Sequence, residues 1–225
     1  YYKEMIEIEG KHGKYIVIDG LDGSGKGTQF ALLEKLGDGV IFTYEPGGTE
    51  YGETMREVLN NFELSPDGNF YAMLSVRAEQ MSRTIIPALA KGKHVLSDRS
   101  DSSTFAYQVY GQEAKHLEEI FWTLRPQFLP RPDVYIFLDL DPAIIVERLK
   151  NISRDIKDVT LSHFDSEALE FHTRVRAGFK EFARVVNKSG TSTCHFIDAS
   201  RTPEEVHNDI MDIITSYIGT DATGT

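Results

Sequence analysis

Residues 18–29 read IDGLDGSGKGTQ and lie close to the start of the chain. The stretch fits a phosphate-binding loop of the form G-x-x-x-x-G-K-[ST] at Gly20, Gly25 and Lys26, but Gly27 stands where a magnesium-binding hydroxyl is expected. An apolar run precedes the loop and a helical pattern begins near Lys26, which is the strand-turn-helix setting that the motif requires. We therefore expect a nucleotide-binding loop here.

The glycines of this loop let successive backbone N–H groups face a chain of phosphates, and the start of the following helix adds the positive end of its dipole. The Lys26 ammonium would reach the β- and γ-phosphates of a nucleoside triphosphate. The residues expected to bind this nucleotide are Gly20, Leu21, Asp22, Gly23, Ser24, Gly25, Lys26, Gly27 and Thr28.

Short apolar runs alternate with helical patterns along the chain. The runs occupy residues 14–19, 40–43, 94–98, 134–139 and 194–198, and each ends in a polar residue. Helical spacing is found at residues 26–36, 50–60, 70–90, 142–150, 166–187 and 203–218. This alternation predicts an α/β fold, a doubly wound parallel five-stranded sheet flanked by helices, with ligands at the carboxyl ends of the strands.

The 225 residues fit one domain, which we expect to span residues 1–219. Residues 151–163 (NISRDIKDVTLSH) combine weak periodicity with mixed charge between two helical patterns, and they predict a mobile lid at about 150–164. Residues 220–225 (TDATGT) are interpreted as a disordered tail.

Composition narrows the class of partner. The 24 Lys and Arg residues against 35 Asp and Glu residues give a net charge of −11, which argues against a nucleic-acid-binding surface. The single cysteine, Cys194, cannot form an internal disulfide and favours a reducing compartment. The N-terminal stretch lacks a signal-peptide core, and no apolar run reaches membrane-spanning length. We expect a cytoplasmic protein that binds neither nucleic acid nor membrane.

Further motifs follow the loop in a fixed order. They are EPGGTEYGETMREVL at 45–59, RAEQ at 77–80, DRSDSSTFAYQVYG at 98–111, RPDVYIFLD at 131–139 and FDSEALEFHTRVRAGF at 164–179. In this order they resemble the thymidylate kinase family, nucleoside monophosphate kinases with a P-loop nucleotide kinase fold, over nearly the whole chain. The resemblance implies transfer of the ATP γ-phosphate to dTMP, giving dTDP and ADP for dTTP synthesis. It also implies Mg²⁺ as cofactor and a homodimer.

The resemblance implies where dTMP would bind. Arg56 and Arg99 look like the arginines that hold the acceptor phosphate, a role that suits planar guanidinium groups. Arg77 matches the arginine that hydrogen-bonds thymine, and Tyr107 matches the tyrosine that crowds the 2′ position and favours deoxyribose. The other residues expected to contact base or sugar are Asp22, Glu45, Met73, Ser103, Thr104 and Gln108.

The resemblance also implies a catalytic set. Asp98 looks like the family's magnesium-linked carboxylate, which binds the ion directly or through water. Members of the family carry a catalytic arginine either in the phosphate loop or in the lid. Here Gly23 occupies the loop position, so we expect the lid to supply the arginine as Arg154, with Arg148 also near ATP. The predicted catalytic residues are Lys26, Asp98, Arg99 and Arg154.

Three positions depart from the family pattern. Tyr44 stands where an arginine often precedes Glu-Pro-Gly-Gly-Thr, and Ser100 replaces the usual aromatic residue or histidine after Asp-Arg. Met73 replaces the phenylalanine that stacks on thymine, and it lies one helical turn before Arg77. Because a thioether contacts a ring less rigidly than phenylalanine does, we expect looser base selectivity.

Parts of the sequence are also compatible with other functions. The GSGKGTQ segment also resembles adenylate kinases and the DRS segment deoxynucleoside kinases, so another nucleotide kinase with different base selectivity is an alternative. Outside the kinases, the alternatives are a GTPase-type module and a non-catalytic nucleotide-binding subunit. The NKSG segment at 187–190 lacks the Asp of a guanine motif, and the retained Lys26, Asp98 and Arg99 disfavour a subunit without turnover.

Overall fold

The strands of the described chain form one parallel sheet in the order β2-β3-β1-β4-β5. A computed structural model describes residues 13–37, 39–154 and 162–219, and side chains outside 151–167. The strands are β1 (Tyr15–Gly20), β2 (Val40–Tyr44), β3 (His94–Asp98), β4 (Val134–Asp139) and β5 (Thr193–Asp198). They agree with the five predicted runs to within one residue at each end.

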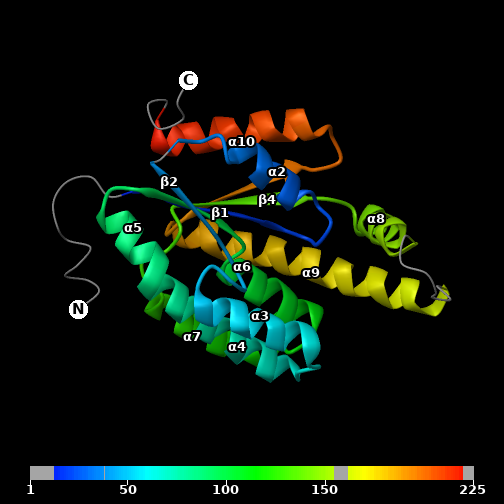
Figure 1. The fold of residues 1–225 in the computed structure, drawn as a ribbon. Helices are drawn as coiled ribbons and strands as arrows, with labels where there is room; N and C mark the ends of the chain where they lie inside the picture. Colours follow the sequence, from blue (N-terminus) through cyan, green and yellow to red (C-terminus); the bar gives the residue numbers. More distant parts are fainter. Residues whose placement is uncertain (1–12, 38, 155–161, 220–225) are drawn as a thin grey trace.

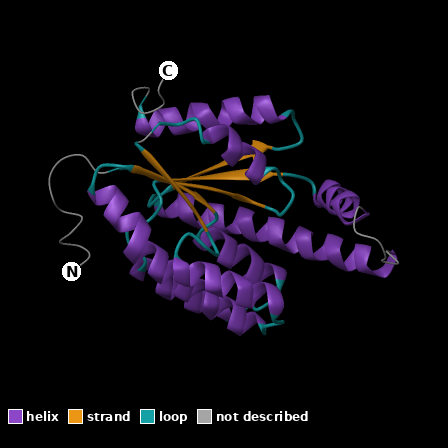
Figure 2. Ribbon diagram, viewed as in Figure 1, coloured by secondary structure: helices purple, strands orange, loops and turns teal. Residues whose placement is uncertain are grey.

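Helices cover both faces of this sheet (Figures 1 and 2). On one face, above the sheet in Figure 1, lie α2 (Lys26–Leu33) and α10 (Pro203–Ile218). The opposite face carries α4 (Pro66–Gln80), α6 (Asp101–Thr104), α7 (Leu117–Leu124) and α9 (Ser162–Ser189). The remaining helices are α3 (Glu50–Asn61), η1 (Met81–Ile85), α5 (Ile86–Ala90), η2 (Phe105–Gly111), η3 (Arg125–Gln127) and α8 (Pro142–Arg154). The predicted doubly wound α/β fold is confirmed.

The central strands are apolar at successive positions because helices cover both of their sides. Ile16, Val17 and Ile18 of β1 are fully buried, as are Val134 and Ile136 of β4. Such continuous runs distinguish these strands from the alternating strands of a sheet with one wet face.

An aromatic core joins β4 to the helices beneath it. The ring of Phe105 lies 5.0 Å from that of Phe121 and 6.0 Å from that of Phe182, which comes from α9. Helix α9 also approaches η2 closely, since a Cβ atom at Gly178 would lie 2.8 Å from the Cα atom of Ala106. This packing fixes η2, a helix that carries predicted substrate contacts.

Two parts of the chain differ from the sequence-based expectation. The sequence patterns predicted no helix over residues 101–127, where α6, η2, α7 and η3 follow one another. In η2, a π-helix over Phe105–Gly111, the wider turn breaks the 3.6-residue spacing of apolar positions, and the flanking helices are short. At the expected lid, α8 continues to Arg154 and α9 begins at Ser162, so both ends of that segment are helical. Residues 155–161 and the expected tail at 220–225 lie outside the described residues, and the domain boundaries stay a prediction.

Candidate active site

A cleft of about 960 Å³ opens at the carboxyl ends of β2 and β3 beside the phosphate-binding loop. Its walls come from the loop, the start of α2, the end of β2, and residues of α3, α4, α6 and η2. Segments that are far apart in the sequence thus meet at the sheet edge where an open α/β fold binds its ligands.

Lys26 lies at the start of α2 with its side chain directed back over the loop. Its Nζ donates hydrogen bonds to the carbonyl oxygens of Gly20, at 2.9 Å, and Leu21, at 3.0 Å. Gly25 precedes it with a φ of 102°, the left-handed conformation that turns the strand into the helix. Burial and, secondarily, the positive charge of Arg99 lower the pKa of Lys26 to about 8. The ammonium therefore remains mostly charged at neutral pH and is poorly solvated, which suits it to a phosphate ligand.

Gly27 follows on the first turn of α2, on the exposed side of the helix. A Cβ atom built at this position would meet no atom within 4 Å beyond its chain neighbours and the backbone of its own helical turns. Packing therefore does not require glycine here, and the residue that departs from the loop pattern has room for a hydroxyl.

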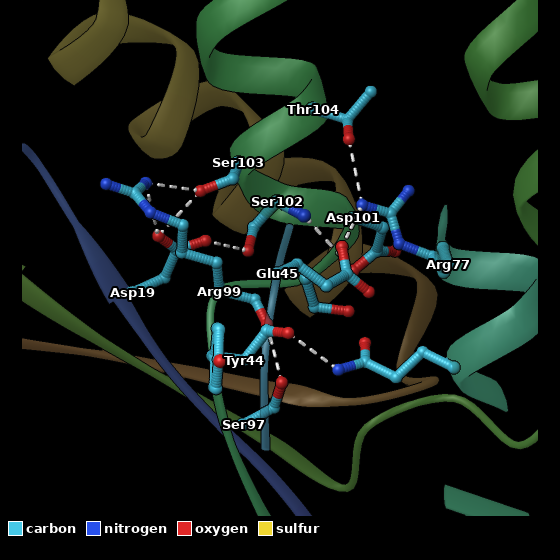
Figure 3. Close-up of polar contacts among 12 residues, drawn as sticks. Asp19, Tyr44, Glu45, Arg77, Ser97, Arg99, Asp101, Ser102, Ser103 and Thr104 are labelled. Atoms are coloured by element: carbon cyan, nitrogen blue, oxygen red, sulfur yellow. Dashed lines mark hydrogen bonds and ion pairs between the residues drawn. The ribbon is translucent and has the colours of Figure 1, made fainter. Parts of the chain in front are cut away.

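Arg99 comes directly after β3 and is held at several points of its guanidinium group (Figure 3). Its Nη1 donates to Ser103 Oγ at 2.8 Å and lies 3.6 Å from Asp19 Oδ1. Its Nη2 donates to Asp22 Oδ1, and its Cζ lies 5.1 Å from the centroid of the Tyr107 ring. These contacts fix a cation between the phosphate loop and η2.

Asp19, which the sequence-based prediction did not include, is the fully buried residue that organises this corner. One oxygen accepts from the Gly20 N–H at 2.8 Å and from Ser103 Oγ at 2.8 Å, and the other accepts from Ser102 Oγ at 2.6 Å (Figure 3). The carboxylate thus ties the phosphate loop to the segment after β3. A strand-end carboxylate directly before the first loop glycine is a signal that could have identified it.

Asp98 lines the cleft at the end of β3, opposite Ile18 of β1. Burial raises the pKa of its carboxyl, although the charges of Lys26 and Arg99 act to lower it. Within the described part of the chain, its buried Oδ1 accepts no hydrogen bond. The carboxylate therefore has a free acceptor in the wall of the cleft.

Arg77 forms a buried ion pair behind the cleft wall. Its Nη2 donates to Glu45 Oε2 at 2.6 Å and to Thr104 Oγ1 at 2.8 Å (Figure 3). The side chains of Arg77 and Glu45 are 2% and 0% exposed. Burial raises the pKa of the Glu45 carboxyl, and the Arg77 charge opposes that shift. In the described residues, no hydrogen bond is found for Arg77 Nε or Nη1, which remain available as donors.

Helix α8 contacts the loop from the other side. Arg148 Nη1 donates to the Gly23 carbonyl oxygen at 3.0 Å. Gly23 has a φ of 79°, and a Cβ atom there would lie 3.7 Å from Leu149 and 3.8 Å from Ile145. Arg154 ends α8, and its side chain lies outside the described residues.

A protein-family model described as thymidylate kinase matches residues 18–210, which include the loop, the cleft walls and η2. The chain belongs to the thymidylate kinase family. Phosphorylation of dTMP, the reaction expected from the sequence motifs, is the reaction of this family. The alternatives with another acceptor or without turnover are not favoured by this match.

Curated relatives and a solved structure agree with the family. The chain is 32% identical to a thymidylate kinase of Nitratidesulfovibrio vulgaris, over 93% of this chain and 96% of the relative. It is 37% identical to a thymidylate kinase of Pelotomaculum thermopropionicum, over 88% and 91% of the two chains. The crystal structure of a thymidylate kinase from Ehrlichia chaffeensis superposes with a TM-score of 0.70 at 27% identity, covering 91% of this chain and 99% of that one.

Most predicted site residues of this thymidylate kinase family member meet in the cleft. Those that line it are Asp22, Gly23, Gly25, Lys26, Gly27, Thr28, Glu45, Arg56, Met73, Asp98, Arg99, Ser103, Tyr107 and Gln108. Six others lie outside its wall, namely the loop residues Gly20, Leu21 and Ser24, the pair Arg77 and Thr104 behind Glu45, and Arg148 against Gly23. Their individual roles stay predictions.

A second buried network supports the site from below. Asp101 accepts hydrogen bonds from Arg125 Nε at 2.7 Å and from the Tyr135 hydroxyl at 2.6 Å. Asp101 is adjacent to Ser102, so the network holds α6 in place under Asp19. Sequence reasoning missed it because its members lie in three separate elements.

None of the helices in the described ranges combines the length and the apolar composition that a membrane span needs.

Proposed function

We propose that this chain transfers the γ-phosphoryl group of ATP to dTMP, giving dTDP and ADP for dTTP synthesis. The observation that carries the proposal is the shared cleft, lined by the phosphate-binding loop on one side and by Arg56, Met73, Arg99 and Tyr107 on the other. A triphosphate on the loop and a monophosphate on these side chains would meet near Lys26. Their reacting groups would then be held together, which is the main requirement of phosphoryl transfer.

The chain supplies positioned positive charge rather than a nucleophile. An oxygen of the acceptor phosphate attacks the γ-phosphorus in line, and ADP departs with the electrons of the broken P–O bond. Lys26 would stabilise the transferring group, while Arg99 and Arg56 would hold the acceptor phosphate. Arg99 is suited to this because its contacts with Ser103 and Asp22 hold it in the cleft.

Mg²⁺ fits the cleft as a cofactor shared with the substrate. Asp98 offers a buried oxygen that accepts no hydrogen bond from the described residues. Nowhere in the described ranges do three His, Cys, Asp or Glu side chains gather into a metal site, so phosphate oxygens and water would complete the shell of the ion. When bound, the ion would neutralise phosphate charge, and Asp98 would orient it directly or through water.

We propose that Tyr107 discriminates against a 2′-hydroxyl and that Asp22 lies near the 3′-hydroxyl of the acceptor. The Tyr107 hydroxyl donates to Asp22 Oδ2 at 3.1 Å and accepts from the Asp22 N–H at 3.0 Å. This fixed ring would occupy the space that a 2′-hydroxyl needs. Met73, 7% exposed, would contact thymine, and its flexible side chain predicts looser base selectivity.

Arg154 is proposed as the catalytic arginine, since the loop carries Gly23 and helix α8 leads away from it toward this residue. Replacing Arg154 with alanine should lower kcat by about a hundredfold or more. Replacing Arg148 should mainly raise KM for ATP, because Arg148 holds the Gly23 carbonyl. Initial rates with both substrates varied test this, with melting temperature as the control for folding. Turnover of Arg154→Ala within a few-fold of wild type, together with loss of activity in Arg148→Ala, would show the assignment to be wrong.

We also propose a homodimer acting in the cytoplasm. Family resemblance supports the dimer, and the aromatic side chains of Phe62 after α3 and Tyr71 on α4 are 64% and 50% exposed. The single cysteine supports a reducing compartment. A monomeric mass in sedimentation at micromolar concentration would contradict the dimer.

An ADP-release assay tests the proposed reaction. It compares dTMP, dUMP, dCMP, AMP, GMP and free thymidine as acceptors, each with Mg²⁺ and with excess EDTA. We expect the highest kcat/KM with dTMP, measurable activity with dUMP, and loss of activity in EDTA. Preference for AMP, or activity with thymidine alone, would overturn the proposal.

A further inference from the structure

Tyr44 ends β2 and lines the cleft beside Arg56. Tyr44 is 37% exposed, but its ring packs against a defined surface of the protein. A Cβ atom at Gly47 would lie 2.1 Å from Tyr44 Cε2, so the ring rests directly on the glycine backbone. Gly47 also has a φ of 142°, which a residue with a side chain rarely adopts.

The Tyr44 hydroxyl donates a hydrogen bond to Glu53 Oε1 on the first turn of α3. The same oxygen accepts from the Gly48 N–H at 3.0 Å. These two bonds lower the pKa of the Glu53 carboxyl, with the hydroxyl as the larger cause. Glu53 is therefore a carboxylate whose Oε1 already accepts two hydrogen bonds.

Arg56 follows Glu53 by three residues, so the two side chains share a face of α3. Opposite charges at this spacing ordinarily pair. In the described chain no ion pair joins them, although the Arg56 charge helps to lower the pKa of the Glu53 carboxyl; the Arg56 Cζ atom lies 5.4 Å from the centroid of the Tyr44 ring. A guanidinium group at that distance is attracted by the electrons of the ring.

We propose that Tyr44 is a positioning residue for the acceptor phosphate. Its ring holds the Arg56 guanidinium at the cleft, and its hydroxyl occupies Glu53 so that Glu53 does not draw Arg56 away. This inference rests on the proposed role of Arg56 in binding dTMP. The inference also explains how the chain can function with tyrosine where the family often has arginine. Arg56 supplies the cation in this part of the cleft, and the Tyr44 ring holds it in place.

The test measures KM for dTMP, KM for ATP and kcat, with dTMP affinity by calorimetry as a readout independent of turnover. Tyr44→Ala should raise KM and Kd for dTMP roughly tenfold, and Tyr44→Phe, which keeps the ring, about threefold. KM for ATP and kcat should change less than about twofold, since Lys26 and the loop are untouched. Tyr51→Phe is the matched control, because its hydroxyl pairs with Ser75 outside the cleft.

Two double variants separate positioning from general support. In an Arg56→Ala background, Tyr44→Ala should add less than about twofold, because the residue through which it acts is gone. Adding Glu53→Gln to Tyr44→Phe should restore most of the dTMP affinity by removing the competing charge. An additive Tyr44 effect in the Arg56→Ala background, or an unchanged KM in Tyr44→Ala, would overturn the inference. If either of these results is found while the wild-type chain phosphorylates dTMP normally, the Tyr44 inference fails and the proposed function stands. A wild-type chain that neither binds nor phosphorylates dTMP contradicts both the inference and the proposed function.

Discussion

Replacing Lys26 with alanine is expected to lower kcat/KM by about a thousandfold or more while the protein stays folded. Lys26 is 7% exposed, and among the described residues its ammonium donates hydrogen bonds to two loop carbonyl oxygens and lies near Arg99 and the carboxylates of Asp19 and Asp98. Because burial already disfavours this charge in the free protein, its removal costs little folding free energy. The phosphoryl group in transfer, in contrast, would lose the Lys26 ammonium, which would be its closest cation. Steady-state kinetics and a thermal melt measure the two effects separately.

Gly27→Ser is the matched variant for this experiment. It restores the hydroxyl of the common loop pattern at a position where the new Cβ would meet no atom within 4 Å beyond its chain neighbours and the backbone of its own helical turns. We expect turnover within a few-fold of wild type and an unchanged melt. If Lys26→Ala kept more than a tenth of wild-type activity, the loop would not be the phosphate site proposed here.

Replacing Arg77 with methionine is expected to destabilise the fold by about 3–5 kcal/mol, because it leaves the buried Glu45 carboxylate without its partner. For a chain of this size, that corresponds to a melting temperature lower by roughly 10 °C. Binding of dTMP should weaken at the same time if Arg77 also supplies the thymine contact. Arg83→Met is the control, since its side chain is 72% exposed and its pair with Glu79 is a surface pair.

The pH dependence of this variant gives a second readout. With Arg77 gone, burial and, secondarily, the charges of Asp101 and Asp19 act on Glu45 unopposed and raise its pKa further above the unfolded value. The folded state then binds a proton more tightly than the unfolded state, so stability falls as pH rises from the unfolded pKa toward the folded one. The deficit against wild type should therefore shrink at mildly acidic pH. The double variant Glu45→Gln with Arg77→Met should recover stability but not dTMP binding, and equal melts for Arg77→Met and wild type would refute the buried pair.

Local patterns in the sequence were sufficient for the sheet. Each strand is a short apolar run, and β1 and β4 are buried along nearly their whole length, which leaves a signal within six residues. The loop residues and Arg99 were also predictable, because they stand at fixed distances from strand ends. The predicted helix at 70–90 is present, although α4, η1 and α5 divide it.

Contacts between distant segments were not predictable in the same way. The hydrogen bonds of Asp19 with Ser102 and Ser103 join residues more than 80 positions apart. Asp101, Arg125 and Tyr135 come from three elements. The sequence shows Tyr44 only as a departure from the family pattern, because its contacts with Glu53 and Arg56 depend on how α3 packs back against Gly47.

Gly23 has a consequence for how this site can evolve. Its neighbours Leu149 and Ile145 would meet a new Cβ atom at ordinary contact distances, so space does not forbid a larger residue. The obstacle is the backbone, because a φ of 79° costs a residue with a side chain about 1–2 kcal/mol. An arginine introduced by a single mutation would arrive on a loop whose conformation disfavours it. If Arg154 is the catalytic arginine proposed above, moving that charge into the loop would carry this backbone cost in addition to the change of residue, which would slow such a move in evolution.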